Sequence, residues 1–150
     1  MRLVATPARL LVAGVILAAC ARPLAPTGGE QDQTPPRIVA TTPAEREVVT
    51  DTDLTVAFEF DERISERGVR ESILVSPSTG VPRVEKGRSE IRVRMPGGWR
   101  AGEVYRVVLL PGVRDLFGNE TREPASLVFS TGPPVPSTAI GGLVVDRITG

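Results

Sequence analysis

Hydrophobic and polar residues alternate in short segments between residues 37 and 131 of the chain. The clearest segment covers residues 54–60, in which Leu54, Val56, Phe58 and Phe60 alternate with smaller or polar residues. Successive side chains of a β-strand point to opposite faces, so this spacing predicts a strand with one apolar face and with Glu59 on the other.

Six further segments have the same character and are separated by proline- or glycine-containing turns. They lie at residues 37–41, 73–75, 81–85, 89–95, 103–110 and 127–129. Pro82 favours an edge position for its strand, because proline has no N–H for the ladder. Residues 62–72 favour a loop with at most a short helix. Seven short strands over about 95 residues predict an all-β, immunoglobulin-like β-sandwich, with Phe58, Phe60 and Phe129 in its core.

The N-terminus has a different pattern. Residues 10–19 read LLVAGVILAA and follow the positive charges of Arg2 and Arg9. This run is too short for a transmembrane helix, which needs about 20 apolar residues. It fits the hydrophobic region of a secretory signal peptide instead.

The run ends in Leu17, Ala18, Ala19 and Cys20, which resemble a bacterial lipobox. The resemblance implies cleavage before Cys20 and attachment of acyl chains to its sulfur and its new amino group. More than one chain is needed for stable anchoring to a membrane. Ala21 stands where enterobacterial sorting would read an aspartate as a retention signal, which favours the outer membrane. An ordinary secretory signal and a cytoplasmic protein with a buried N-terminal helix are the alternatives.

Composition divides the chain into five expected parts. Residues 1–19 are a signal peptide, and residues 20–36 are the lipidated cysteine and a flexible tether rich in proline and glycine. The sandwich follows at 37–131 and a proline-rich linker at 132–139. Residues 140–150 resemble the first strand of a carboxypeptidase-regulatory-like or similar β-module. We therefore expect either a longer protein or a strand that packs on a partner.

Composition also excludes several kinds of chemistry. The 150 residues contain no histidine and one cysteine. A Ser-His-Asp triad, a Cys-His pair and a His/Cys zinc site therefore cannot form, nor can an intramolecular disulfide. The 18 basic residues balance 18 acidic ones, which argues against nucleic acid as a partner. We expect no catalytic residue and no cofactor.

Glu59, Asp61 and Glu62 are the acidic residues that lie closest to an apolar strand. Glycoside hydrolysis needs two carboxylates facing each other across a cleft, whereas Glu59 and Asp61 share the outer face of one strand. A calcium site, to which Asp51 and Asp53 could contribute, needs about six to eight oxygen ligands. Solvated carboxylates are the expectation, and no metal site is assigned.

Three stretches together resemble the SbsA-type bacterial Ig-like domain over roughly residues 36–131. They are TPP at 34–36 with TP at 42–43, LTVAFEFD at 54–61, and YRVVLLPGVRDLFGN at 105–119 leading to FST at 129–131. The tether also resembles that of lipoproteins that carry this domain directly after the lipobox. The resemblance implies a sandwich with a structural or adhesive role.

Two features in or next to these stretches are expected to be structural. Trp99 and Tyr105 are spaced as in a tyrosine corner, where the tyrosine hydroxyl bonds to upstream backbone. Asp115, Gly118 and Asn119 predict a turn, because Asp and Asn side chains bond to nearby backbone and glycine permits positive φ. Phe117, inside this turn, is expected to fold back onto the end of the sandwich.

The sequence thus predicts a membrane-anchored envelope lipoprotein whose Ig-like domain is a spacer or an adhesion or interaction module. One alternative is a binding module for peptidoglycan, polysaccharide or an envelope protein, acting through loops or a sheet edge. Another is the N-terminal module of a longer enzyme or transport-associated protein. The membrane is the only partner that the sequence itself identifies.

Overall fold

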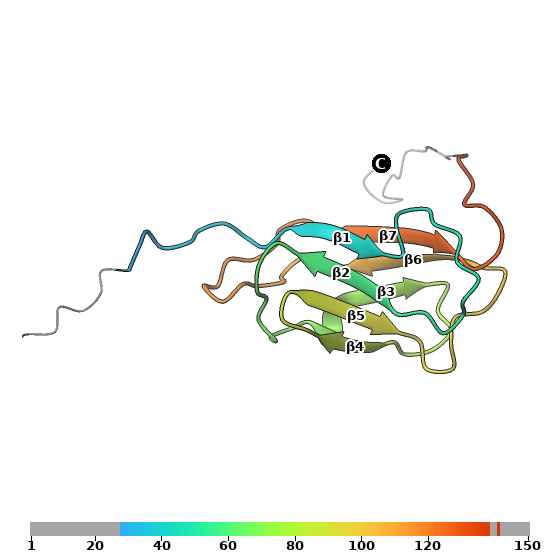
Figure 1. The fold of residues 1–150 in the computed structure, drawn as a ribbon, viewed down its shortest axis with the longest axis horizontal. Coiled ribbons are helices and arrows are strands. Elements are labelled where there is room, and N and C mark those ends of the chain that lie inside the picture. The colour runs from blue at the N-terminus through green and yellow to red at the C-terminus, as the bar shows by residue number, and fades with distance from the viewer. Residues whose placement is uncertain (1–27, 139–140, 142–150) are drawn as a thin grey trace, which may run out of the picture. The chain divides into compact units, whose positions relative to one another are not determined.

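The computed structural model describes residues 28–138 and residue 141, and these contain seven strands and one short 3₁₀-helix (Figure 1). The elements are β1 (Ile38–Thr42), β2 (Val56–Phe60), η1 (Arg70–Ser72), β3 (Ile73–Ser76), β4 (Arg83–Lys86), β5 (Glu90–Arg94), β6 (Val104–Leu109) and β7 (Ala125–Ser130). Each strand lies within two residues of its predicted position. None of the helices in the described part of the chain is long and apolar enough to cross a membrane.

The chain divides into two compact units. All the elements belong to the second unit, Asp32–Gly150, while the described residues 28–31 of the first unit, Met1–Gln31, form no helix or strand. The expected signal peptide with Leu17, Ala18, Ala19 and Cys20 lies outside the described residues. So does the expected strand at 140–150, except for Gly141.

The strands form two antiparallel sheets, one in the order β1-β2-β5-β4 and the other in the order β3-β6-β7. Figure 1 shows the first sheet lying over the second, so that each covers one face of the other. The predicted all-β, Ig-like β-sandwich is confirmed. Strand β4 begins directly after Pro82 and occupies an edge, since its ladder pairs with β5 alone.

The core lies between the sheets and follows the alternation of each strand. In β2, Val56, Phe58 and Phe60 are buried and Glu59 is exposed. Ala57 is buried as well, although it lies on the outer face, because the longer side chains opposite it in the register cover a single methyl group. The other buried hydrophobic residues are Ile64, Val69, Ile73, Val84, Ile91, Val93, Met95, Trp99, Tyr105, Val107, Leu109, Val113, Leu127 and Phe129.

The segment after β1 changes sheets. Strand β1 pairs with β2, and then residues 46–49 run beside the end of β7, where Val48 and Ser130 form a parallel bridge. Three backbone hydrogen bonds hold this segment: Arg46 N to Val128 O at 2.6 Å, Ser130 N to Glu47 O at 2.9 Å, and Val49 N to Ser130 O at 2.8 Å. The edge of β7 is therefore covered over its last residues.

The antiparallel register gives the sandwich two opposite ends. The chain enters at the first, which we call the entry end, where Arg37 N and Asp61 Oδ1 are 2.8 Å apart. It leaves at the second, the exit end, where Thr131 N donates to Glu103 O at 2.8 Å. At the exit end the Arg46 guanidinium also donates to the carbonyls of Val135 and Pro136, at 2.8 and 3.0 Å.

Candidate functional site

The β6–β7 loop, residues 110–124, lies at the entry end and is organised by one buried carboxylate. Asp115 is 2% exposed, and its Oδ1 accepts N–H groups of Phe117 (2.8 Å), Gly118 (2.5 Å) and Asn119 (2.8 Å). Gly118 has a φ of 95°, a conformation that residues with a Cβ rarely adopt. The structure thus contains the turn predicted for Asp115, Gly118 and Asn119, with side-chain bonds to nearby backbone and a glycine at positive φ.

The same turn contacts the segment through which the chain enters. The Asn119 Nδ2 donates to Asp115 Oδ2 at 2.7 Å and to the backbone oxygen of Asp32 at 3.1 Å. Asp32 in turn accepts hydrogen bonds from Thr34 within its own segment. Asn119 therefore connects the turn to the first residues of the second unit.

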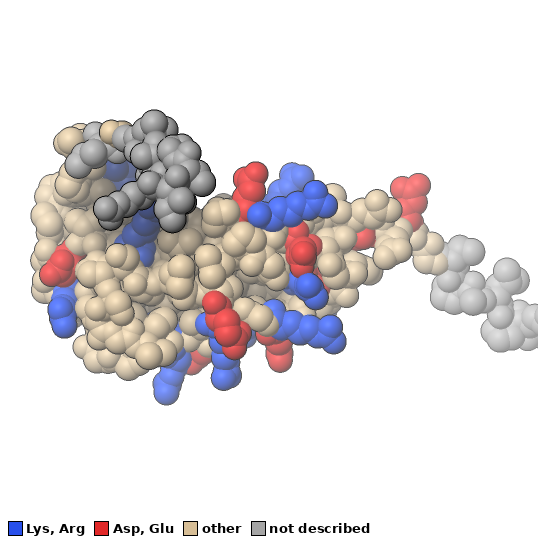
Figure 2. Space-filling model, turned by 180° about the vertical axis from the view of Figure 1, so that it is seen from behind, with Lys and Arg blue, Asp and Glu red and all other residues tan. Residues whose placement is uncertain are grey.

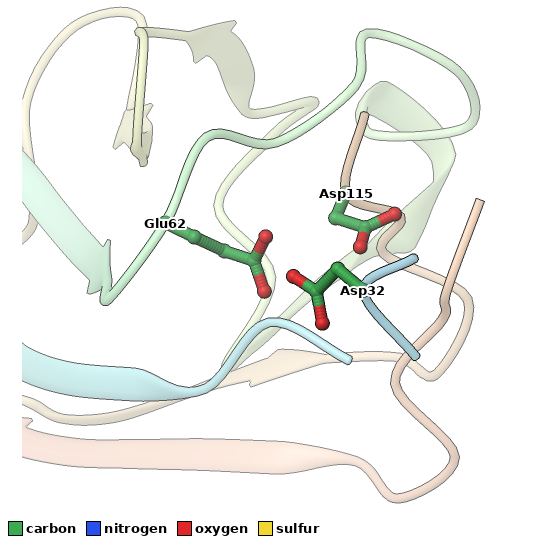
Figure 3. Close-up of side chains that lie close together, drawn as sticks. All are labelled: Asp32, Glu62 and Asp115. Atoms are coloured by element: carbon green, nitrogen blue, oxygen red, sulfur yellow. The ribbon is translucent and has the colours of Figure 1, made fainter. Parts of the chain in front are cut away.

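Three carboxylates converge at this point. Asp32, Glu62 from the loop after β2, and Asp115 point toward one another (Figure 3). One oxygen of each lies within 4.8 Å of the others. None of the three belongs to an ion pair found among the described residues, so like charges meet here in a partly buried place. We call these three side chains the acidic cluster.

Two members of the acidic cluster have shifted pKa values. Burial raises the pKa of Glu62, and the negative charges of Asp115, Asp32 and Asp61 raise it further. The pKa of Asp32 is lowered, because the hydroxyl and N–H groups of Thr34 donate to its carboxylate at 2.6 and 2.9 Å. On acidification, Glu62 is therefore expected to take up a proton before Asp32 does.

The acidic cluster is the group of described residues that could offer oxygens to a metal ion. Asp115, however, already uses Oδ1 for three backbone N–H groups and Oδ2 for Asn119. Calcium needs about six to eight oxygen ligands. The geometry therefore supports a hydrogen-bonded turn with two facing carboxylates better than it supports a metal centre.

The acidic residues singled out from the sequence have different surroundings. Glu62 belongs to the acidic cluster, whereas Glu59 is exposed on β2 and Asp61 bonds to the backbone N–H of Arg37. The sequence does not predict the participation of Asp32, because composition assigns residues 20–36 to the tether. The Asp-x-Thr spacing of Asp32 and Thr34, typical of a local side-chain turn, was the available signal.

The expected position of Phe117 is wrong. Phe117 and its neighbour Leu116 are 62% and 61% exposed, because the bonds to Asp115 fix the backbone of the turn with both side chains pointing outward. Leu116 lines a shallow depression together with Arg63, Lys86 and Arg88. Arg63 comes from the loop after β2, and Lys86 and Arg88 come from the end of β4 and the turn after it, so no local motif in the sequence indicates their meeting.

Three aromatic residues form a packed group toward the exit end. Tyr105 is fully buried, and its hydroxyl accepts a hydrogen bond from Arg100 N at 2.9 Å, which is the contact of a tyrosine corner. The Trp99 ring meets Tyr105 and Phe129 edge-on, at centroid distances of 4.9 and 5.1 Å. Phe58, Phe60 and Phe129 are all buried. These side chains hold the two sheets together.

Lysine, arginine, aspartate and glutamate are interspersed on the face of the molecule in Figure 2, without a large area of one sign. Most basic side chains of the described residues are exposed, and two of them form ion pairs, Arg92 with Glu90 and Arg114 with Glu120. This distribution fits the balanced charge of the sequence.

Comparisons with known proteins give one family. The family model described as "Bacterial Ig-like domain" matches residues 32–131. Among solved structures, an L,D-transpeptidase from Mycobacterium smegmatis is similar at 18% identity with a TM-score of 0.48. The match covers 66% of this chain and 41% of that chain, so this chain spans less than half of the transpeptidase's length. A search of curated proteins found no match.

Proposed function

The chain belongs to the bacterial Ig-like domain family, and from this we propose that it is a membrane-anchored envelope lipoprotein whose domain serves as a spacer or interaction module. Within the family we assign it to the SbsA type, on the residues 54–61 and 105–119. The proposal gives the sandwich a structural role and no catalytic step.

One observation supports the spacer role most directly: the chain enters and leaves the sandwich at opposite ends. Arg37 is held at the entry end by Asp61, and Thr131 at the exit end by Glu103 and Gly102. A domain threaded in this way separates whatever precedes it from whatever follows it by the full length of its strands. Proline-rich sequence follows at residues 133–136, and the Arg46 guanidinium holds the carbonyls of Val135 and Pro136 at this end of the sandwich.

Membrane attachment rests on the sequence features that precede the sandwich. A basic start, an apolar run, two alanines and Cys20 occur in the order of a lipoprotein signal. We propose that Cys20 is lipidated, that residues 20–36 tether the domain, and that the outer membrane is the destination because Ala21 follows the cysteine.

Replacing the acceptor thiol tests this attachment. We expect Cys20→Ser to abolish labelling of the chain by radioactive fatty acid and to leave it unprocessed or soluble, because a hydroxyl cannot replace the thiol in this lipidation. Membrane fractionation and the mass of the processed chain measure both effects. A variant that stays membrane-bound and is cut at the same site would refute the lipobox.

A second function, recognition of a partner through a sheet edge, is favoured by β3. This strand pairs with β6 on one side, and within the described residues no strand pairs with its other side. Leu74, in the middle of β3, is 53% exposed. An unpaired edge with an exposed apolar side chain can accept an added strand from a partner protein.

Binding to purified cell wall separates the spacer role from a role in peptidoglycan or polysaccharide recognition. For a spacer we expect the chain to stay in the supernatant when cell-wall sacculi are sedimented at physiological salt. Retention that survives a wash at high salt would favour the binding module, since the contact would then exceed what screened surface charges give.

A further inference from the structure

We propose that Leu116 and Phe117, together with Arg63, Lys86 and Arg88, form a surface that contacts an anionic lipid bilayer. We call these five side chains the tip surface. The inference rests on the lipid anchor proposed above, and it adds a second contact between the protein and the membrane.

The apolar part of the tip surface is exposed and held in place. Leu116 and Phe117 are adjacent in sequence and each is more than half exposed. The Phe117 N–H donates to the buried Asp115 carboxylate at 2.8 Å, so the turn keeps its shape whether or not the side chains are covered. A prearranged turn loses little conformational entropy on binding. Phenylalanine and leucine are residues that enter the boundary between headgroups and acyl chains.

The basic residues of the tip surface line one shallow depression with Leu116, the neighbour of Phe117 in sequence. Arg63 comes from the loop after β2, and Lys86 and Arg88 lie where β4 turns toward β5. None of the three takes part in the ion pairs found among the residues that the structure describes, Arg92–Glu90 and Arg114–Glu120. Basic side chains close to an anionic leaflet add to membrane affinity, and apolar residues among them supply the part that enters the lipid.

The three carboxylates of the acidic cluster lie close to one another and form no ion pair with the cations of the tip surface. Asp115 is buried, and Asp32 and Glu62 point toward it and toward one another (Figure 3). Other acidic side chains at this end are exposed, among them Glu66 and Glu123, but none of the ion pairs among the described residues includes a cation of the tip surface, so these three charges stay available to lipid.

The proposed anchor brings this end to the membrane. Asp32 is the twelfth residue after Cys20, and twelve fully extended steps of the chain reach at most about 43 Å. Asn119, two residues after Phe117, donates to the Asp32 backbone oxygen. The tip surface thus lies where the tether joins the sandwich, and the exit end faces the opposite way.

The depth of residue 117 in the lipid tests the proposal on the full processed chain. Phe117→Trp places a fluorescent reporter in the tip surface, and Val81→Trp places one on an 85% exposed residue in the β3–β4 loop at the exit end. Both variants keep Trp99, which is buried. The chains are reconstituted in phosphatidylcholine vesicles with about a quarter phosphatidylglycerol, and with acyl chains that carry bromine as quencher. We expect at least about twofold stronger quenching of Phe117→Trp than of Val81→Trp.

Removing the charges tests the basic part. Adding Arg63→Gln, Lys86→Gln and Arg88→Gln to the Phe117→Trp chain is expected to abolish the gain in quenching between pure phosphatidylcholine and anionic vesicles. Circular dichroism checks that each variant is folded. Equal quenching at positions 117 and 81 in a chain whose mass includes the lipid would overturn the tip surface alone, and it would be the result if the surface served a protein partner. A chain without lipid would overturn both the anchor and the tip surface.

Discussion

At the scale of single residues, two polar side chains accept backbone N–H groups near the two ends of the sandwich. Asp115 accepts three N–H groups at the entry end, and the Tyr105 hydroxyl accepts Arg100 N toward the exit end. Leaving a buried N–H group without a partner costs about 1–3 kcal/mol. Such residues therefore stabilise loops that apolar packing alone does not fix.

The ionised carboxylate of Glu62, in contrast, is expected to lower the stability of the folded chain, and this expectation can be tested. Its pKa is raised in the folded chain above the ordinary value of 4.5, so the folded state holds a proton that the unfolded state has lost. The free energy of unfolding therefore falls as pH rises from the unfolded-state pKa of Glu62 to its folded-state pKa. Above the folded-state pKa it stays lowered by a constant amount. We expect Glu62→Gln to raise the melting temperature at pH 7 and to leave it unchanged at pH 3.

The matched control for this measurement is Glu66→Gln on the same loop, an exposed residue outside the acidic cluster. It should shift the melting temperature little at either pH. A Glu62→Gln chain that melts at the same temperature as the unchanged protein at pH 7 would show that the three carboxylates do not repel one another in the folded state.

At the scale of elements, β2 has the strongest two-faced pattern. It lies between β1 and β5, with Phe58 opposite Ile91 and Thr41 in the register and 1% exposed. Glu59 lies beside Phe58 on the outer face, where its cross-strand neighbour is Glu90. On this one strand, Phe58 therefore packs in the core, whereas Glu59 does not contribute to it.

Two substitutions in β2 measure this difference. We expect Phe58→Ala to lower the free energy of unfolding by about 3–5 kcal/mol, because it leaves a cavity between the sheets. Glu59→Ala should change it by less than about 0.5 kcal/mol, since the side chain is exposed and faces a like charge. Urea unfolding followed by circular dichroism gives both values. Similar losses for the two variants would contradict the assigned faces.

The strands could be predicted because alternation and turn residues are local properties of the sequence. The buried positions Ile91, Tyr105 and Phe129 follow from the same alternation. The acidic cluster could not be predicted, since its three members come from segments that only the folded chain brings together. Phe117 is a further example. The sequence predicts the turn around Asp115, because Asp and Asn side chains bond to nearby backbone, but it does not predict the direction in which the side chains on that turn point.

At the scale of the whole molecule, the sandwich is held by its core rather than by a cross-link. The chain has one cysteine, and the proposed lipid occupies it. Seventeen buried hydrophobic side chains form the core cluster between the two sheets. Stability is therefore expected to depend on apolar packing throughout residues 56–129.

A metal titration tests whether a bound cation adds to the stability that the core supplies. Because the Asp115 oxygens are already hydrogen-bonded, we expect millimolar calcium or a chelator to leave the melting temperature within about 1 °C, since a ligand stabilises only by binding the folded state. Differential scanning calorimetry measures the midpoint, and magnesium serves as the comparison ion. A midpoint that rises with calcium alone would show that Asp32 and Glu62 complete a cation site.

The parallel contact between residues 46–49 and the end of β7 has a mechanical consequence. A pull applied between an anchored N-terminus and the C-terminal continuation draws these two segments along each other in opposite directions. The hydrogen bonds from Arg46 N, Ser130 N and Val49 N are then loaded together, in shear, instead of opening one after another. A domain built in this way resists force with several bonds at once, as the proposed spacer between a membrane anchor and a further module would require.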